Sequence, residues 1–153
     1  MLFRSIGAVK IKTIGDAYLA VTGLPDYDPD HAEKIAALAL RFRTEIKRFA
    51  DESKYPLQVR IGIHTGPVVA GIIGRTTSHF DLWGDSVNTA ARLEATCPPG
   101  AIQVSADLAK ALQDRFLFTD RGSVELKGKG PTRTFLLEAA KANEAQEAAP
   151  RAA

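Results

Sequence analysis

The chain has 153 residues, with 45% hydrophobic, 25% charged and 7% aromatic residues, which is typical of one globular domain and excludes a collagen-like, disordered or coiled-coil chain. Its 20 Lys and Arg against 18 Asp and Glu leave a net charge of +2, which does not indicate a nucleic-acid or membrane-surface partner. A single cysteine, Cys97, excludes an internal disulfide, and no apolar run approaches the roughly 18–20 residues of a membrane span. We therefore expect a cytoplasmic domain without nucleic-acid partner or membrane segment.

The first third of the chain predicts a hairpin followed by a long helix. Val9–Ile14 alternates as a strand does, Ala17–Thr22 reads as a second strand, and the intervening Gly15-Asp16 suits a two-residue turn. Asp28-Pro29 resembles a helix cap followed by proline at the first helical position. Behind it, apolar residues recur at three- and four-residue spacing and predict about six helical turns: Ile35, Leu38, Ala39, Phe42, Ile46 and Phe49.

The remaining segments mix strands and helices without strict alternation. Residues 57–63 predict a half-buried strand, and the apolar run Val68–Ile73 is typical of a buried one. Helices are expected at 84–96 and 105–114, and strands at 101–104, 116–119, 123–126 and 133–138. This pattern predicts an α+β fold, a mostly antiparallel sheet with helices packed on it, over residues 1–138. Residues 139–153, rich in Ala and Glu, are expected to be a disordered tail.

Three polar residues in the hairpin and in a later apolar segment are candidates for chemistry. Asp16 lies at the expected hairpin tip, where its carboxylate suits a hard cation such as Mg²⁺, although a plain turn aspartate is the commoner case. Lys12 is expected on the strand face that carries Lys10 and Ile14, and taken alone it is a solvated lysine. Asp81 is flanked by apolar residues in Phe80-Asp81-Leu82-Trp83. It is therefore either a loop cap or a recognition group held against a hydrophobic slot.

The helix expected after Gly84 carries a polar ridge. Asp85, Asn88 and Arg92 are three and four residues apart, so they fall on one side. Asn and Arg on one ridge suit sugar and phosphate oxygens, because the arginine fork donates two bonds. An exposed polar face is the alternative. The later turn Lys127-Gly128-Lys129-Gly130 either holds a phosphate or is a basic hairpin.

Histidine and cysteine give no metal signature. His31, His64 and His79 share no ligand spacing, so each is expected to have a structural role, and Cys97 is expected to be a small buried apolar residue. The chain contains no Walker A loop, no HExxH motif and no dinucleotide-binding G-x-G-x-x-G.

The order of four segments is more informative than any single residue. The segments are Lys12–Tyr18 (KTIGDAY), Arg60–Gly66 (RIGIHTG), Phe80–Arg92 (FDLWGDSVNTAAR) and Lys127–Gly130 (KGKG). In this order they resemble the class III nucleotidyl cyclases, the catalytic domains of adenylate and guanylate cyclases, over about residues 9–138. The run Asp-Leu-Trp-Gly-Asp-Ser-Val-Asn is a long and specific match. The resemblance implies a ferredoxin-like class III cyclase fold.

The resemblance also implies a mechanism in which two subunits pack head to tail and form active sites between them. Asp16 is similar to one of two family aspartates that hold Mg²⁺ or Mn²⁺, and Arg60 to an arginine that holds the polyphosphate. The opposite subunit would contribute Asn88 to orient the substrate, Arg92 to stabilise the transition-state phosphorus and Lys127 to hold the terminal phosphates. The implied reaction is attack of the ribose 3′-oxygen on the α-phosphorus with release of pyrophosphate, assisted by two metals.

Lys12 and Asp81 favour adenine over guanine. Adenine offers an acceptor at N1 and a donor at N6, which Lys12 and Asp81 would match, whereas guanine reverses both groups. Family members of the guanylate type resemble this pattern with Glu and Cys at these two places. We therefore expect an adenylate cyclase acting on ATP. The alternatives are a guanylate cyclase, and a non-catalytic nucleotide-binding or dimerisation partner of a full-length cyclase.

The chain departs from the family pattern at its start. The second metal aspartate of the family lies on a first strand, but only 15 residues precede Asp16 and none is acidic. We therefore expect an N-terminally truncated domain whose sheet lacks a central strand. It would be a fragment of a longer cyclase or have a misassigned start, be a decayed remnant, or act as a partial subunit. Acting as a partial subunit, it would complete the metal half-site of a longer partner, and the dimer would be a homodimer or a heterodimer.

Overall fold

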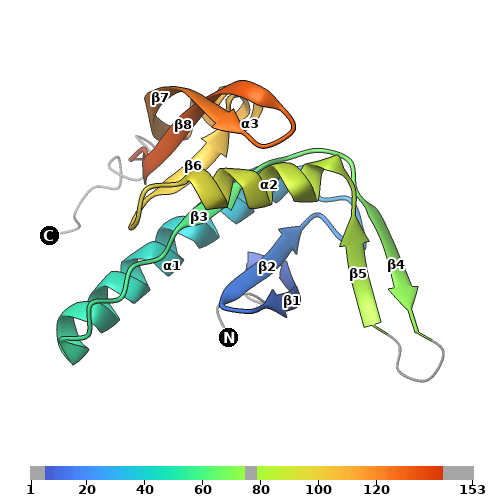
Figure 1. Cartoon of the computed structure of the whole chain (residues 1–153), viewed down its shortest axis with the longest axis horizontal. Helices are drawn as coiled ribbons and strands as arrows, with labels where there is room; N and C mark the ends of the chain where they lie inside the picture. The colour runs from blue at the N-terminus through green and yellow to red at the C-terminus, as the bar shows by residue number, and fades with distance from the viewer. Residues whose placement is uncertain (1–5, 75–78, 143–153) are drawn as a thin grey trace, which may run out of the picture.

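The computed structural model describes residues 6–74 and 79–142. In chain order (Figure 1), these residues form β1 (Ala8–Ile14), β2 (Ala17–Thr22), α1 (His31–Ser53), β3 (Ile61–Ile63), β4 (Val69–Ile73), β5 (His79–Trp83), α2 (Asp85–Thr96), β6 (Ile102–Ser105), α3 (Ala106–Leu112), β7 (Phe116–Leu126) and β8 (Gly130–Ala140). One sheet has the order β3-β6-β8-β7, and β1–β2 and β4–β5 form separate two-stranded ribbons. Only the β3–β6 pair is parallel among these strands. The predicted α+β class with mostly antiparallel pairing is confirmed.

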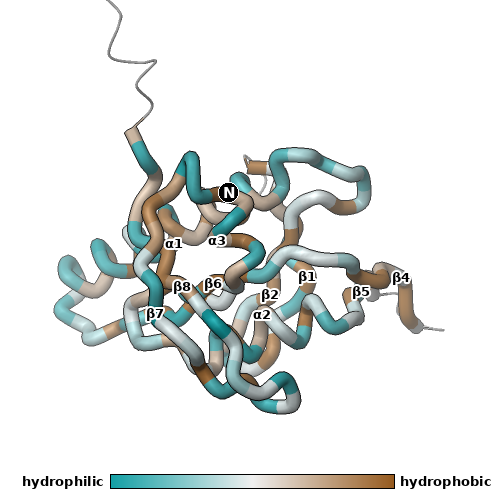
Figure 2. The backbone as a smooth tube through the Cα atoms, turned by 90° about the horizontal axis from the view of Figure 1, so that it is seen from above, coloured by the Kyte–Doolittle hydropathy of each residue, from teal (hydrophilic) through white to brown (hydrophobic). Residues whose placement is uncertain are grey.

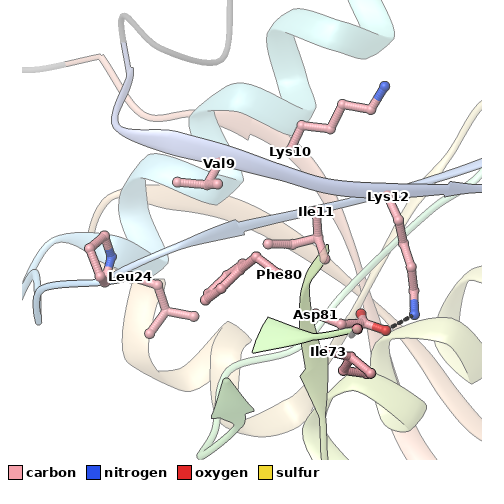
Figure 3. A pocket seen from close by; sticks show the side chains of 10 residues that line it. Val9, Lys10, Ile11, Lys12, Leu24, Ile73, Phe80 and Asp81 are labelled. Atoms are coloured by element: carbon pink, nitrogen blue, oxygen red, sulfur yellow. Dashed lines mark hydrogen bonds and ion pairs between the residues drawn. The ribbon is translucent and has the colours of Figure 1, made fainter. Parts of the chain in front are cut away.

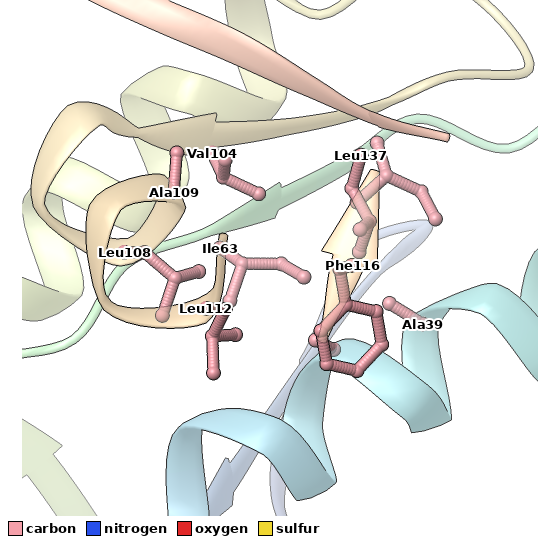
Figure 4. Packing of buried hydrophobic residues seen from close by; sticks show 10 residues of the cluster. Ala39, Ile63, Val104, Leu108, Ala109, Leu112, Phe116 and Leu137 are labelled. Carbon is pink, nitrogen blue, oxygen red and sulfur yellow. The ribbon is translucent and has the colours of Figure 1, made fainter. Parts of the chain in front are cut away.

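The hydrophobic core lies between the four-stranded sheet and the two helices α1 and α3. Strands β3 and β6 direct alternate residues, such as Ile63 and Val104, toward these helices. Figure 4 shows the packing, in which α1, α3 and all four strands contribute buried side chains, among them Ala39, Leu108, Leu112, Phe116 and Leu137. No helix in the described ranges is long and apolar enough to cross a bilayer. Removing this cluster from water provides the main driving force for folding of this region.

Helix α2 packs on the other face of the sheet at unusually close range. A Cβ atom placed on Gly62 of β3 would lie 2.2 Å from the backbone nitrogen of Glu94 and 2.3 Å from the carbonyl oxygen of Ala90. The α2 backbone therefore touches β3 where only glycine leaves room. The Gln103 side chain of β6 also donates to the carbonyl oxygen of Leu93, at 3.1 Å. These contacts fix where α2 places its polar ridge.

The β4–β5 ribbon extends away from the core, which corrects the expected burial of Val68–Ile73. Val69 is 66% exposed and Ile72 is 73% exposed. Figure 2 shows the hydrophobic colouring along this projecting ribbon. The apolar run is a strand, as predicted, but among the described strands β4 pairs with β5 alone. An apolar run is expected to pack against another apolar surface. In the part of the chain that the structure describes, no such surface covers β4.

A bulge in β1 corrects the expected face of Lys12. Lys10 is opposite Ala20, whereas Lys12 is opposite Leu19, with a register shift between them. Because adjacent residues of β2 face opposite sides, Lys10 and Lys12 do so too. Lys10 lies over the Tyr18 ring at 4.7 Å, and Lys12 points to β5. Strict alternation, which underlies the prediction, fails at a bulge.

Several element boundaries differ from those predicted. Strand β5 was not predicted, because its five residues carry a carboxylate between apolar neighbours. The helix begins at His31 with Asp30 as its N-cap, two residues after the predicted cap Asp28. Asp28 accepts hydrogen bonds from the Asp30 backbone and the Lys34 ammonium. Only residues 61–63 of the expected strand 57–63 pair with another strand.

The end of the chain forms a longer hairpin than expected. The two predicted strands 116–119 and 123–126 are one strand, β7, with an irregularity near Gly122. Strand β8 runs to Ala140, two residues beyond the expected end of the domain at 138. Residues 143–153 of the predicted tail lie outside the described residues.

Replacing Gly62 by alanine is expected to lower the free energy of unfolding by about 1–3 kcal/mol, because the methyl group would push α2 off β3. Urea denaturation measures the change. Gly71→Ala in β4 is the matched control: its Cβ would meet only the Trp83 side chain, at an ordinary 3.4 Å, so we expect stability to change by no more than about 0.5 kcal/mol. Equal losses in the two variants would contradict the close packing.

Candidate functional site

Lys12 and Asp81 meet across the junction of the β1–β2 and β4–β5 ribbons. The Lys12 Nζ donates to Asp81 Oδ2 at 2.7 Å, and both side chains are half-buried. Figure 3 shows the pair, with Lys10 directed away from it. Asp81 lies on β5, opposite Gly71 of β4, so it is a strand residue and not a loop cap. The structure therefore brings together a cationic donor and an anionic acceptor that are 69 residues apart.

The pair borders an open pocket of about 910 Å³. Its walls are mainly apolar and come from β1, the segment after β2 and the β4–β5 ribbon: Val9, Ile11, Leu24, Pro25, Ile73 and Phe80. Such a pocket, apolar with few polar groups, suits a flat heterocycle. The Lys12 ammonium, together with the backbone N–H of Leu82 that donates to Oδ1 at 2.8 Å, lowers the pKa of Asp81. The carboxylate is therefore an acceptor at neutral pH.

The polar ridge of α2 faces the turn between β7 and β8. The Arg92 guanidinium lies 3.6 Å from the position of a Cβ on Gly128, which places it beside the turn that carries Lys127. Asn88 is exposed one helical turn before Arg92. Among the described residues, no hydrogen bond or ion pair engages the side chains of Asn88, Arg92 or Lys127. The structure thus places Asn88 and Arg92 on the helix that lies beside the turn carrying Lys127. One amide and two cations without ion-pair partners among the described residues are a composition that suits phosphate oxygens.

Among the described residues, Asp16 and Arg60 make no hydrogen bond or ion pair with either of these two groups of residues. Asp16 is exposed at the tip of the β1–β2 hairpin. The Arg60 Nε donates to Glu94 Oε1 of α2 at 3.0 Å. Sequence reasoning did not anticipate Glu94 as this partner, because the pairing depends on α2 crossing β3. Arg60 is therefore held on the α2 side of the sheet.

The carboxylate of Asp16 fits a metal ion only in part. Mg²⁺ binds through one or two carboxylates together with substrate oxygens, and an exposed carboxylate at a hairpin tip can be one such ligand. No group of three or more His, Cys, Asp or Glu side chains in residues 6–74 and 79–142 is arranged to hold a metal. Within one chain, these residues supply a single ligand and not a complete metal site.

The remaining candidates have structural surroundings. His64 Nδ1 lies 2.9 Å from Ser105 Oγ, and burial lowers the pKa of His64. Cys97 is buried, as predicted, and burial raises the pKa of its thiol, so it is a poor nucleophile. His31 accepts a hydrogen bond at its carbonyl oxygen from Thr22, at 2.7 Å. The side chain of His79 lies outside the described residues.

Comparison with protein families gives one match over almost the whole chain. A model described as the adenylate and guanylate cyclase catalytic domain matches residues 1–139. The match contains every residue singled out above as a candidate.

Relatives and solved structures of both substrate types are similar to the chain. It is 44% identical to a membrane guanylyl cyclase of Dictyostelium discoideum over 131 residues, covering 86% of the chain and 8% of the relative. It is 40% identical to an adenylate cyclase of Mycobacterium tuberculosis over 151 residues, covering 96% and 34%. The guanylate cyclase domain of RhGC from Catenaria anguillulae, solved in complex with GTP, superposes with a TM-score of 0.85 at 38% identity, covering 92% of the chain and 77% of that domain. The chain thus spans about a third or less of these two curated relatives.

The Lys12–Asp81 ion pair is expected to make stability depend on pH. Because the folded-state pKa of Asp81 is lowered, the pair stabilises the fold above the unfolded-state pKa of about 3.9 and loses this contribution as the pH falls through the lowered value. Asp81→Asn, which keeps the acceptor for Leu82, should therefore be less stable than the unmodified chain at neutral pH and approach its stability once the pH falls below the lowered pKa of Asp81, by urea denaturation. Lys12→Gln should behave in the same way. A difference that persists at low pH would show that the pair is not its source.

Proposed function

Because the chain belongs to the family of adenylate and guanylate cyclase catalytic domains, we propose that it is an adenylate cyclase domain, converting ATP to 3′,5′-cyclic AMP and pyrophosphate at the interface of two subunits. The observation that carries the proposal is the Lys12–Asp81 pair beside an apolar pocket. Cyclic-nucleotide signalling is the corresponding role.

The choice of ATP follows from hydrogen-bond polarity. Lys12 has only donors and the ionised Asp81 only acceptors. Adenine, with its N1 acceptor and N6 amine, can accept from Lys12 and donate to Asp81 when it enters between them. With Lys12 opposite ring position 1 and Asp81 opposite position 6, guanine would place its N1 donor against the Lys12 donor and its O6 acceptor against the Asp81 acceptor, and both mismatches are costly. The walls of the pocket contribute apolar contact with the ring.

The phosphates would be bound by α2 and the β7–β8 turn. Arg92 lies beside Gly128, the neighbour of Lys127 in the turn, and neither cation is in an ion pair among the described residues, so both can neutralise the triphosphate without breaking an existing pair. Arg92, one helical turn from Asn88, would act at the α-phosphorus, where negative charge develops during attack by the ribose 3′-oxygen. Asn88 would orient the ribose, and Lys127 would hold the terminal phosphates.

Two subunits are needed because one chain does not gather all candidate residues. Asp16, on the separate β1–β2 ribbon, and Arg60, paired with Glu94, make no hydrogen bond or ion pair with Asn88, Arg92 or Lys127 among the described residues. They would complete the site formed by these three residues of another subunit. A divalent Mg²⁺ or Mn²⁺, bound in part by Asp16, would supply charge neutralisation at the phosphate oxygens. The exposed apolar β4–β5 ribbon supports such pairing, since exposed apolar surface is typical of interaction sites. A homodimer or a heterodimer with a longer cyclase subunit would fit.

Two other functions have some support. Guanylate cyclase is favoured by the membrane guanylyl cyclase relative and the GTP complex of the Catenaria domain, and is opposed by Lys12 and Asp81. A non-catalytic nucleotide-binding partner is favoured because Asp16 is the one candidate metal ligand among the described residues, whereas the proposed reaction uses two metals. These functions differ in product: cyclic GMP in the first case, and none in the second.

Incubation with Mn²⁺ and either ATP or GTP, alone and with a full-length cyclase that lacks its own purine-binding pair, tests the proposed activity. We expect cyclic AMP to exceed cyclic GMP by mass spectrometry. Arg92→Ala should lower the rate about 100-fold, whereas Arg41→Ala, a matched change on the exposed face of α1, should not. Prevailing cyclic GMP would support the guanylate alternative, and ATP binding without product in either mixture would support the non-catalytic one.

Replacement of Lys12 and Asp81 by the residues of the guanylate type is expected to shift nucleotide preference from ATP to GTP. Lys12→Glu combined with Asp81→Cys should shift the ratio of the dissociation constants for ATP and GTP toward GTP by about ten- to hundredfold, measured calorimetrically with Mn²⁺. Lys110→Glu is the charge-matched control, because Lys110 is exposed on α3 and does not line the pocket, and it should leave the ratio unchanged. Unchanged ATP preference in the double variant would contradict the assignment of the purine site.

A further inference from the structure

The two lysines of the β7–β8 turn have different surroundings. Lys129 Nζ donates to Asp85 Oδ2 at 2.6 Å, and its side chain is only 26% exposed. Lys127 is exposed and has no ion-pair partner among the described residues. Only one of the two is therefore free to meet a ligand without first losing an anion. The sequence, with its repeated Lys-Gly, does not distinguish them.

The ion pair links the turn to the start of α2. Asp85 is the first residue of α2, and Lys129 is closed into the turn by the hydrogen bond from its backbone N–H to the carbonyl oxygen of Leu126, at 2.8 Å. Gly128, between the lysines, adopts a φ of 74° and lies against the Arg92 guanidinium. The turn is thus ion-paired to α2 through Lys129 and contacts α2 at Gly128. Lys127 is the next residue along.

We propose that the Asp85–Lys129 ion pair is a clasp that holds the β7–β8 turn on α2, so that Lys127 and Arg92 face the same polyphosphate. Asp85 and Lys129 are positioning residues that act through Lys127 and Arg92. The inference rests on the proposed function, because it deepens the account of the phosphate site.

The electrostatics of Asp85 favour a clasp over a simple surface charge. A carboxylate beside a polyphosphate site repels the ligand unless a cation neutralises it. Lys129 provides that cation and, with weaker attraction from Arg92, lowers the pKa of Asp85. The Asp85 side chain is 74% exposed, so it has little packing role of its own. Its contribution to the site therefore passes through Lys129.

If Asp85 acts as a clasp, its replacement by Asn changes the affinity for a polyphosphate in the direction opposite to that expected from its charge alone. Removing the negative charge with Asp85→Asn should tighten binding of an anion if only Coulomb attraction mattered. If the clasp positions the turn, Asp85→Asn should weaken binding of inorganic tripolyphosphate about two- to fivefold, the range expected for an exposed ion pair. Lys129→Gln should weaken it by the same factor, and the double variant no further. Lys129→Arg, which keeps the pair, should bind nearly as the unmodified chain does.

Calorimetric titration of the chain with tripolyphosphate and Mg²⁺ provides the test, with thermal unfolding to establish that each variant folds. Asp51→Asn, near the end of α1, controls for loss of one negative charge. Tighter binding by Asp85→Asn, unchanged binding, or additive losses in the double variant would each overturn the clasp and leave the proposed cyclase function intact. Failure of the unmodified chain to bind tripolyphosphate would overturn both the clasp and the proposed phosphate site.

Discussion

The direct contact between the α2 backbone and Gly62 of β3 determines where the polar residues of α2 lie and which partner Arg60 meets. Because the backbone of Ala90 and Glu94 lies directly against Gly62 with no side chain between them, α2 has little freedom to slide or tilt over β3. Arg60 then reaches Glu94, and the ridge with Asp85 and Arg92 faces the β7–β8 turn. The absence of a side chain at Gly62 thus positions α2 for the Arg60–Glu94 and Asp85–Lys129 ion pairs and for the phosphate-binding candidate Arg92.

The two polar centres of the molecule are built in different ways. The α2 ridge stands on the four-stranded sheet and is supported by the hydrophobic core on its far side. Lys12 and Asp81 stand instead on two-stranded ribbons outside that sheet. Two-stranded ribbons are only marginally stable alone, so the Lys12–Asp81 ion pair contributes to joining them as well as to presenting a donor and an acceptor. The exposed apolar residues of β4 and β5 are consistent with further support from a second subunit.

The strongest sequence predictions concerned long or locally patterned segments. The α1 helix, the α2 helix and the Gly15-Asp16 turn follow from spacing and turn chemistry, which depend on neighbours in the chain. Asp85, Asn88 and Arg92 were correctly placed on one side of α2 for the same reason. Burial of Val68–Ile73 was wrongly predicted, because hydrophobicity indicates that a segment seeks a partner but not whether that partner is in the same chain. The face of Lys12 was wrongly predicted because a bulge leaves no local signal at Lys10-Ile11-Lys12.

The sequence by itself determined the α+β class, the approximate elements and the set of residues that resembles a nucleotidyl cyclase, because these depend on short-range periodicity and on ordered motifs. Only the tertiary structure decided which residues meet. It joined Lys12 to Asp81 across 69 positions, gave Arg60 the partner Glu94, and distinguished Lys129 from Lys127. These pairings depend on strand register and on how closely α2 approaches β3. Both are set by packing of distant segments, which no local pattern in the chain records.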